Sequence, residues 1–243
     1  MPEEASAPGK GQRTRQRIKA AALKLFAQRG LNGVSVRDIN QAAGQKNAGS
    51  INYHFSSRDD LVRELVFDVA TILDNSHNAR ITALEAAGGP NSIREVVQIL
   101  LDTPSISDDH PVADDYSLRF FNLVLISHRE MLFEAMRGQD RGTRRCLEHI
   151  RRMAPDMPAE LLQQRLMLVI NYLITAASSR EAAQADRSAW ENLWGRESAR
   201  DSLADTVVGI ICAPVSDETM ESLKRESRSA GKTKRADAAR RTH

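Results

Sequence analysis

The sequence predicts an all-α protein with a small N-terminal helical head and a larger helical body. Apolar residues recur at helical spacing in every long segment, and no segment shows the alternation of a half-buried strand. Aromatic residues make up only 5% of the 243 residues, while Ala, Leu, Arg and Glu are plentiful, which favours helices. Apolar residues make up 41% and charged residues 27%, as in an ordinary globular protein with a buried core.

The first helix is predicted over residues 13–29. Its apolar positions fall at i, i+4, i+7 and i+8, which is the pattern of an amphipathic helix, and Gly30 ends it. Residues 1–11 contain Pro, Gly, Ala and Ser without periodicity, so we expect a disordered arm there.

Two capping patterns place the next helices. A Ser-x-x-Asp pattern at residues 35–38 is a capping box for a short helix that stops at Gly44. A second one at residues 57–60 caps a longer helix, predicted over residues 58–77. The short polar segment 46–54 lies between them and is expected to be a third short helix.

The body is predicted to consist of longer helices separated by loops that contain Pro and Gly. Their apolar stripes run over residues 93–101, 116–136, 158–178 and 187–212. The polar residues 214–243 follow, and we expect a basic, disordered tail there.

The net charge of +2 hides a segregation of charge along the chain. Residues 1–19 carry five Lys or Arg against two Glu, and residues 222–243 carry eight against two acidic residues. Residues 20–221 are left with a charge of −7. Positive charge concentrated at the ends favours a polyanionic partner such as nucleic acid, although a tail that only solvates the protein is an equal alternative.

The segment 46–54 has two different faces when it is projected as a helix. Ala48, Ile51 and Phe55 fall on one side and predict an inward stripe. The opposite side is dense in hydrogen-bonding groups, and Gly49 there lets a partner approach the backbone closely. Amides bond adenine edges, Lys reaches guanine or phosphate, and Tyr and Ser hold phosphates. A short helix, a glycine turn and such a segment predict a helix-turn-helix whose second helix enters the DNA major groove.

The predicted DNA contacts come from the first three helices and the start of the fourth. Arginines and a serine at helix starts are expected to contact phosphates, which helix N-termini also favour. The candidate residues are Arg13, Arg15, Ser35, Arg37, Gln45, Lys46, Asn47, Gly49, Ser50, Asn52, Tyr53, His54 and Arg58.

Residues 14–61 resemble the TetR family of one-component bacterial regulators. The matching residues are "RIKAAALKLFAQRGLNGVSVRDINQAAG", then "YHF", then Ser57-Arg58 and Leu61. One extra residue stands between Gly44 and Phe55, and Asn52 occupies the place where the family often has the first of two tyrosines. The resemblance therefore assigns no individual bases to Lys46 or Asn47.

The resemblance implies a transcriptional repressor of the bacterial cytoplasm, associated with the nucleoid. Such a protein binds a palindromic operator in double-stranded DNA as a homodimer and is released by a small-molecule effector, without a cofactor. On this basis the head is residues 12–57, helix 58–77 is a connector, and residues 78–213 bind the effector and dimerise.

The last two long helices are the expected dimer interface. Their apolar stripes could pair across a two-fold axis, although a role in the core of one chain is the alternative. The interface candidates are Leu162, Leu166, Val169, Leu173, Leu203, Val207 and Ile211.

The resemblance places the effector pocket between helices 93–101 and 114–136. The apolar lining would include Phe121, and packing or surface roles are the alternative for each position. The effector candidates are Tyr116, Arg119, Phe120, Asn122, Leu125, His128 and Met131.

Other classes of function have less support in the sequence. No run of 18 apolar residues predicts a membrane span, and the N-terminus lacks the apolar segment of a signal peptide. The six histidines and two cysteines show no metal-binding spacing, and Ser127-His128 lies in no nucleophile motif, so we expect no metal and no enzyme. A body that binds a protein partner instead of a small molecule stays open.

Overall fold

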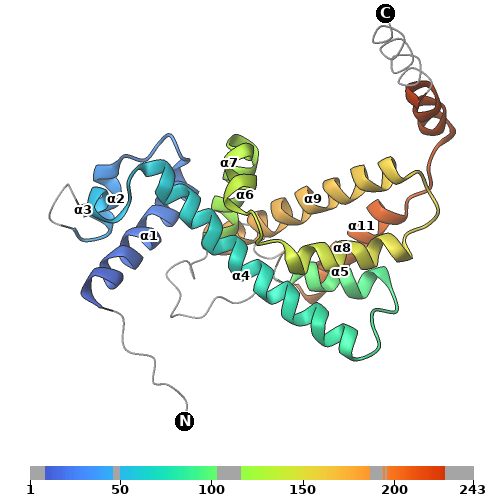
Figure 1. Ribbon diagram of the computed structural model, residues 1–243, viewed down its shortest axis with the longest axis horizontal. Coiled ribbons are helices and arrows are strands. Elements are labelled where there is room, and N and C mark those ends of the chain that lie inside the picture. Colours follow the sequence, from blue (N-terminus) through green and yellow to red (C-terminus); the bar gives the residue numbers. More distant parts are fainter. Residues whose placement is uncertain (1–8, 46–49, 103–115, 187–193, 195, 228–243) are drawn as a thin grey trace, which may run out of the picture.

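The computed structural model describes residues 9–45, 50–102, 116–186, 194 and 196–227. These residues form an all-helical structure without strands, which confirms the predicted fold class. The head contains α1 (Lys10–Arg29), α2 (Val36–Ala42) and α3 (Ser50–His54). The long helix α4 (Arg58–Ala86) runs from the head along the body (Figure 1).

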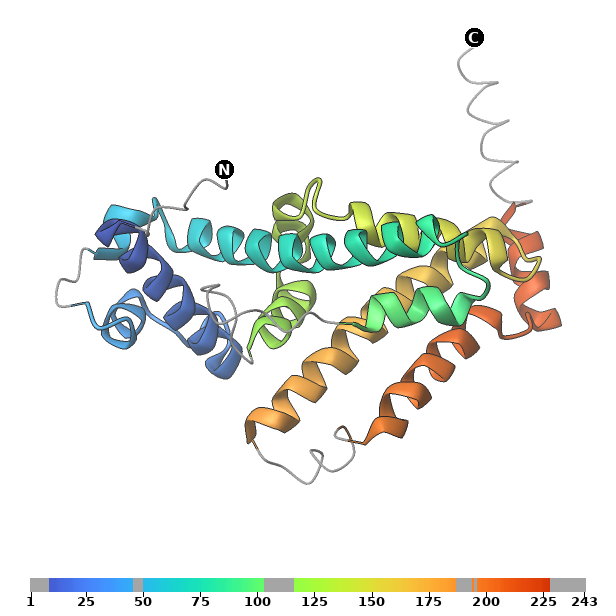
Figure 2. The same cartoon turned by 90° about the horizontal axis from the view of Figure 1, so that it is seen from below.

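The body packs several helices around the distal half of α4. These are α5 (Ile93–Leu101), α6 (Ser117–Ser127), α7 (Arg129–Ala135), α8 (Arg141–Met153), α9 (Ala159–Asp186) and α11 (Glu197–Cys212). Helix α8 packs on α4, α6 packs on α9, and α5 lies between α8 and α11. Figure 2 shows α9 and α11 side by side on the face away from α4.

Helix α4 is longer than predicted, so the expected boundary at residues 77–78 falls inside one continuous helix. The apolar stripe continues through the fully buried Ile81, and the chain turns only at Gly88 and Gly89, whose φ angles are 110° and 90°. Because left-handed φ values favour glycine, the pair is the effective helix stop. Head and body therefore share one rigid element.

The predicted helix 116–136 is wrong as a single helix, because it breaks at His128. His128 has φ −142° and ψ 50°, and it separates α6 from α7. Just before the break, the Ser127 hydroxyl donates to the Leu123 carbonyl at 2.6 Å, and His128 Nδ1 lies 2.9 Å from Ser127 Oγ. Such local side-chain bonds compete with the helix ladder, whereas the apolar spacing continues across the break.

The chain ends also differ from expectation. Lys10 and Gly11 already belong to α1, while residues 1–8 of the predicted arm lie outside the described residues. Residues 217–227 are helical, although the whole segment 214–243 was expected to be disordered. The Ser216 hydroxyl caps this helix by accepting from the Thr219 N–H at 3.3 Å. Residues 228–243 are not described.

Two apolar clusters stabilise the fold, and one of them joins the head to the body. It contains the head core together with Phe120, Phe121 and Val124 of α6. The rings of Phe26 in α1 and Phe120 stack with centroids 6.1 Å apart. The second cluster lies within the body, between α5, α8, α9 and α11.

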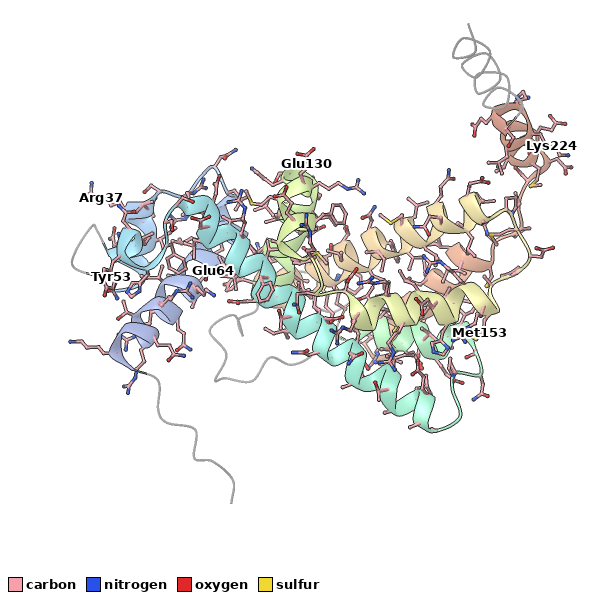
Figure 3. All side chains as sticks on the ribbon, viewed as in Figure 1. Arg37, Tyr53, Glu64, Glu130, Met153 and Lys224 are labelled. Carbon is pink, nitrogen blue, oxygen red and sulfur yellow. The ribbon has the colours of Figure 1, made fainter. Side chains whose placement is uncertain are left out.

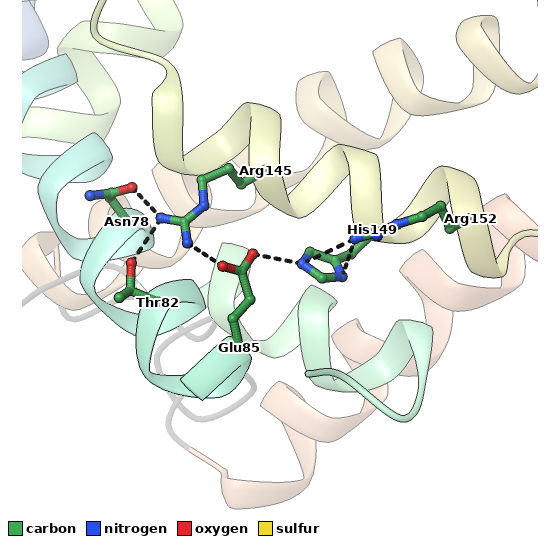
Figure 4. A network of polar contacts seen from close by, with 6 residues as sticks. All are labelled: Asn78, Thr82, Glu85, Arg145, His149 and Arg152. Atoms are coloured by element: carbon green, nitrogen blue, oxygen red, sulfur yellow. Dashed lines mark hydrogen bonds and ion pairs between the residues drawn. The ribbon is translucent and has the colours of Figure 1, made fainter. Parts of the chain in front are cut away.

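Helices α4 and α8 are also joined by a polar network (Figure 4). Arg145 donates to Asn78 Oδ1 at 2.6 Å and to Thr82 Oγ1 at 2.8 Å, and it pairs with Glu85. His149 Nε2 lies 2.8 Å from Glu85 Oε1, and Arg152 donates to His149 Nδ1 at 2.9 Å. The hydrogen bonds from His149 and Arg145 lower the pKa of the Glu85 carboxyl. The network aligns the two helices over about two turns of α8.

Gly142 of α8 lies close against the backbone of α4. A Cβ placed on Gly142 would lie 2.4 Å from the Asn78 backbone nitrogen and 2.8 Å from the Asp74 carbonyl oxygen. We therefore expect Gly142→Ala to lower the free energy of unfolding by about 1–3 kcal/mol, because backbone atoms must move. Urea denaturation followed by circular dichroism measures the change.

Gly11→Ala is the matched control for this prediction. Gly11 is also helical, but a Cβ there meets nothing within 4 Å, so alanine should leave stability unchanged or raise it by up to about 1 kcal/mol. Equal effects at the two positions would contradict the close-contact explanation.

Candidate nucleic-acid interface

The turn between α2 and α3 has the geometry of a helix-turn-helix. Gly44 has φ 67°, and the Gln45 N–H donates to the Asn40 carbonyl at 2.9 Å, which closes the C-terminus of α2. Only a residue that tolerates left-handed φ closes the helix in this way. The Gln45 side chain turns back and donates to the Ala43 carbonyl at 3.1 Å.

Helix α3 has the two faces that the sequence predicts. Ile51 and Phe55 are buried against the head core, whereas Tyr53 is 85% exposed and Asn52 is also exposed. The rings of Tyr53 and His54 meet edge to face with centroids 5.0 Å apart. Because Ile51 and Phe55, two positions before and after it, are both buried, Tyr53 has a fixed outward direction.

Part of the predicted reading surface lies outside the described residues. This holds for Lys46, Asn47 and Gly49, and the side chain of Ser50 is not described either. Ala48, predicted for the inward stripe, also lies outside the described residues. The structure thus starts α3 at Ser50.

The second helix places Arg37 beside α3. Arg37 is exposed, and both Arg37 and Tyr53 lie at the end of the head that points away from the body (Figure 3). The capping box is confirmed: Asp38 N–H donates to Ser35 Oγ at 3.2 Å, and the Ser35 hydroxyl and N–H donate to the Asp38 carboxylate at 2.6 and 2.8 Å. These hydrogen bonds from Ser35 lower the pKa of Asp38. Ser35 therefore orients α2 within the head.

Arg15 of α1 is half-buried, and its side chain contacts α4 and the residue that follows α3. Its guanidinium pairs with Glu64 of α4 and lies 4.7 Å from the centroid of the Phe55 ring. The buried Lys19, one turn later, pairs with Glu64 at 3.0 Å and with Asp68 at 2.8 Å. This cluster holds Phe55, and with it α3, against the connecting helix.

Two further arginines complete the predicted set. Arg58 donates to the Leu31 carbonyl, and its guanidinium lies 5.3 Å from the centroid of the Phe26 ring. These contacts stabilise the loop before α2. Arg13 is exposed in the first turn of α1. The exposed members of the described set are therefore Arg13, Ser35, Arg37, Asn52 and Tyr53, together with the half-buried His54.

The sequence prediction did not include the positioning cluster of Lys19, Glu64 and Asp68. The sequence does contain the pattern that could have indicated this cluster, because two cations stand one turn apart in α1 and two acids stand one turn apart in α4. The pairing itself depends on which helices meet, and this is a tertiary property.

The role of the effector candidates stays a prediction, but the structure shows what several of them contact. Phe120 is buried against Phe26, and the Gln28 amide donates to the Tyr116 hydroxyl at 3.2 Å, so both contact the head. A cavity of about 100 Å³ lies instead among α4, α6, α8 and α9, and Phe121 and Leu118 are the α6 residues in its lining. None of the seven candidates is among the residues that line it. Successive helix positions differ by about 100°, so the adjacent residues Phe120 and Phe121 face different elements.

Most of the predicted dimer residues are core residues of the single chain. Leu166, Val169, Leu173, Val207 and Ile211 are buried between α5, α8, α9 and α11. Leu162 and Leu203 are half-buried. On the opposite face of α9, Leu168 is 59% exposed, and Tyr172, one turn later, is 37% exposed.

No group of three or more His, Cys, Asp or Glu residues suited to a metal ion occurs within the described ranges. Across the same ranges, no helix is both long enough and apolar enough to cross a membrane.

Comparison with known proteins points to one family. The family described as "Bacterial regulatory proteins, tetR family" matches residues 18–65, which span α1 to the start of α4. The chain is 27% identical to the HTH-type transcriptional repressor AcnR of Corynebacterium glutamicum over 172 residues, which cover 67% of this chain and 80% of AcnR. It is 43% identical to the HTH-type transcriptional regulator AcrR of Shigella flexneri over 54 residues, or 22% of this chain and 25% of AcrR.

The fold is also similar to that of a TetR-family protein. A crystal structure of a TetR-family transcription regulator from Shewanella sp. PV-4 superposes with a TM-score of 0.56 at 18% identity, covering 83% of this chain and 99% of the other. The order of the helices, the geometry of the helix-turn-helix and the sequence matches all point to the same family. Residues 18–65 therefore form a helix-turn-helix head of the TetR family, and the chain as a whole is similar to TetR-family transcriptional regulators.

Proposed function

We propose that the protein is a transcriptional repressor that binds a palindromic operator as a homodimer and releases it when a small molecule binds the body. The observation that carries the DNA-binding part is the geometry of α3, where the buried Ile51 and the buried Phe55 directly after the helix fix an exposed Tyr53 at the tip of the head. A helix held in this way enters a major groove without rearrangement. The names of the AcnR relatives support repression rather than activation.

Tyr53→Ala is the direct test of the reading surface. We expect about a tenfold loss of operator affinity, because an exposed side chain at the interface is lost while the head core is untouched. The probe is DNA flanking the protein's own gene, with the site located by footprinting, and affinity is measured by fluorescence anisotropy.

The control is Phe133→Ala, which removes an exposed aromatic residue from α7 of the body. This variant should bind the operator like the wild type. A wild-type titration curve for Tyr53→Ala would remove α3 from the proposed interface.

The dimer is proposed to form through the outer face of α9 together with α11. Leu168 and Tyr172 are apolar and exposed on one side of α9, and α11 packs beside it. On α11, Gly209 is exposed, and a Cβ there would meet nothing within 4 Å of the same chain, which leaves room for a second copy. Two helices from each chain would form a four-helix bundle around a two-fold axis.

Leu168→Asp should convert the dimer into a monomer at micromolar concentration, because the two-fold axis places two unpaired charges in one apolar interface. Sedimentation equilibrium measures the change. Ile126→Asp is the matched control, since Ile126 is an exposed apolar residue of α6 rather than of α9 or α11. A wild-type monomer, or a Leu168→Asp dimer, would contradict the proposed interface.

The release by a small molecule is supported by the cavity in the body. Helix α4 lines the cavity with Ala70, Leu73, Asp74 and His77, and the same helix buries Leu61 and Leu65 in the head region. A ligand that shifts α4 would therefore move α3 relative to its partner on the DNA. The cavity favours a small ligand over a protein partner for the body. Such a repressor acts in the cytoplasm.

A further inference from the structure

The cavity in the body combines an apolar lining with one polar end. Ten of the fourteen residues that line it are apolar, and they come from α4, α5, α6, α9 and the segment after α7. The four polar residues are Asp74, His77, Gln139 and Thr143. A mostly apolar pocket with a few convergent polar groups is the usual form of a small-molecule site.

His77 supplies an unused hydrogen-bonding atom at this end. The side chain is only 7% exposed, and its Nδ1 lies 3.0 Å from Thr143 Oγ1. Its Nε2 is buried and has no hydrogen-bond partner in the described part of the chain. An unpaired buried nitrogen costs free energy, and a ligand group that pairs with it recovers that cost.

The electrostatics of the lining select the charge of the ligand. Burial lowers the pKa of His77 to about 4, so the imidazole is neutral near pH 7. The lining contains no Lys or Arg among the described residues, and its one acidic residue is Asp74. The Asp74 carboxylate already accepts the Gly142 N–H at 2.6 Å, at the N-terminus of α8. An anionic ligand would meet this carboxylate without a cation to offset it, and a cationic ligand would lose its hydration among apolar side chains.

We propose that this cavity binds a small neutral molecule whose hydroxyl group hydrogen-bonds to His77 Nε2 while its apolar part packs among α4, α6 and α9. A hydroxyl both donates and accepts, so it suits either tautomer of the imidazole. The cavity of about 100 Å³ is smaller than the roughly 150 Å³ that accommodates benzene, so it admits a group of about four or five non-hydrogen atoms. The role of this molecule as an effector rests on the proposed function, but its binding does not.

The binding test uses an isosteric series of probes with the full chain labelled at its histidine nitrogens. The probes are 1-butanol, n-pentane and n-butylammonium, which differ only in the terminal group, together with butyrate. We expect millimolar 1-butanol to shift the Nε2 resonance of His77, and we expect n-butylammonium and butyrate to bind at least tenfold more weakly. The proposal is overturned if 1-butanol leaves the Nε2 resonance in place up to high millimolar concentration, or if either ion binds as well.

His77→Phe separates the hydrogen bond from cavity packing. The ring is retained and the nitrogens are lost, so the affinity of 1-butanol relative to n-pentane should fall about three- to tenfold. Continued binding of n-pentane shows that the cavity is intact. If this variant does not fold, Thr143→Val replaces it, because loss of the Nδ1 partner should also change the relative affinity. An unchanged ratio in the folded variant would refute the role of Nε2.

DNA binding is measured separately, with no ligand present. Failure to bind any operator would contradict the proposed function and leave the ligand result standing. Operator binding without a response of His77 to 1-butanol would contradict only the ligand class.

Discussion

Phe26→Ala is expected to lower the free energy of unfolding by about 3–5 kcal/mol, the cost of deleting a buried aromatic ring. Phe26 is fully buried in α1, stacks on Phe120 of α6 and lies under the guanidinium of Arg58. Its loss opens a cavity where the head joins the body. Urea denaturation at pH 7, followed by circular dichroism, gives the free energy.

Two controls make the expected effect specific to this position. Phe67→Ala removes a ring that is 43% exposed and should cost much less, because less apolar surface returns to water. Phe26→Leu retains most of the volume and should cost less than Phe26→Ala. A loss below about 1 kcal/mol for Phe26→Ala would mean that the head and body do not share this core.

Acidification is expected to destabilise the protein between pH 6.5 and about pH 4 through His77. Burial lowers the pKa of His77 from 6.5 to about 4 in the folded state, against a smaller raising effect of Asp74, while Arg80 lowers it slightly further. In this window the unfolded chain binds a proton and the folded chain does not, so stability falls as pH falls. The stability that the neutral, buried His77 contributes to the folded state is present in full well above pH 6.5. About 3 kcal/mol of this stability is lost by the time the pH has fallen to about 4.

The measurement compares urea denaturation of the wild type and His77→Gln at several pH values across this window. The wild type should lose stability steadily, and the variant should show a flatter dependence because it has no group to protonate. Glu85 and Asp38 also have lowered pKa values, but their contributions are lost below the ordinary carboxyl range and so at lower pH. Parallel curves for the two proteins would contradict a buried neutral His77.

Local features were predictable because they depend on residues close in sequence. The capping box needs only Ser35 and Asp38 three positions apart, and the turn needs only a glycine at position 44. The two faces of α3 follow from the 100° rotation per residue, which places Ile51 and Phe55 inside and Tyr53 outside. These features gave the helix-turn-helix and the family resemblance without any knowledge of packing.

Roles that depend on the neighbouring helix were not predictable in the same way. Arg15 and Arg58 have the charge of phosphate contacts, yet they pair with Glu64 and with the Leu31 carbonyl. Val169 and Val207 have the periodicity of an interface, yet they are buried within the chain. An apolar stripe shows that a helix face is covered, but it does not show whether the same chain or a second copy covers it.

Helix periodicity and capping are local, so the helical class, the helix-turn-helix and the outward direction of Tyr53 could be inferred from the order of residues alone. The division of α6 from α7 at His128, the continuation of α4 to Ala86 and the place of His77 at the polar end of a cavity became visible only in the folded chain. These properties arise where segments far apart in the chain meet. Burial, pKa and pairing depend on those meetings, and a linear pattern does not record which helices make them.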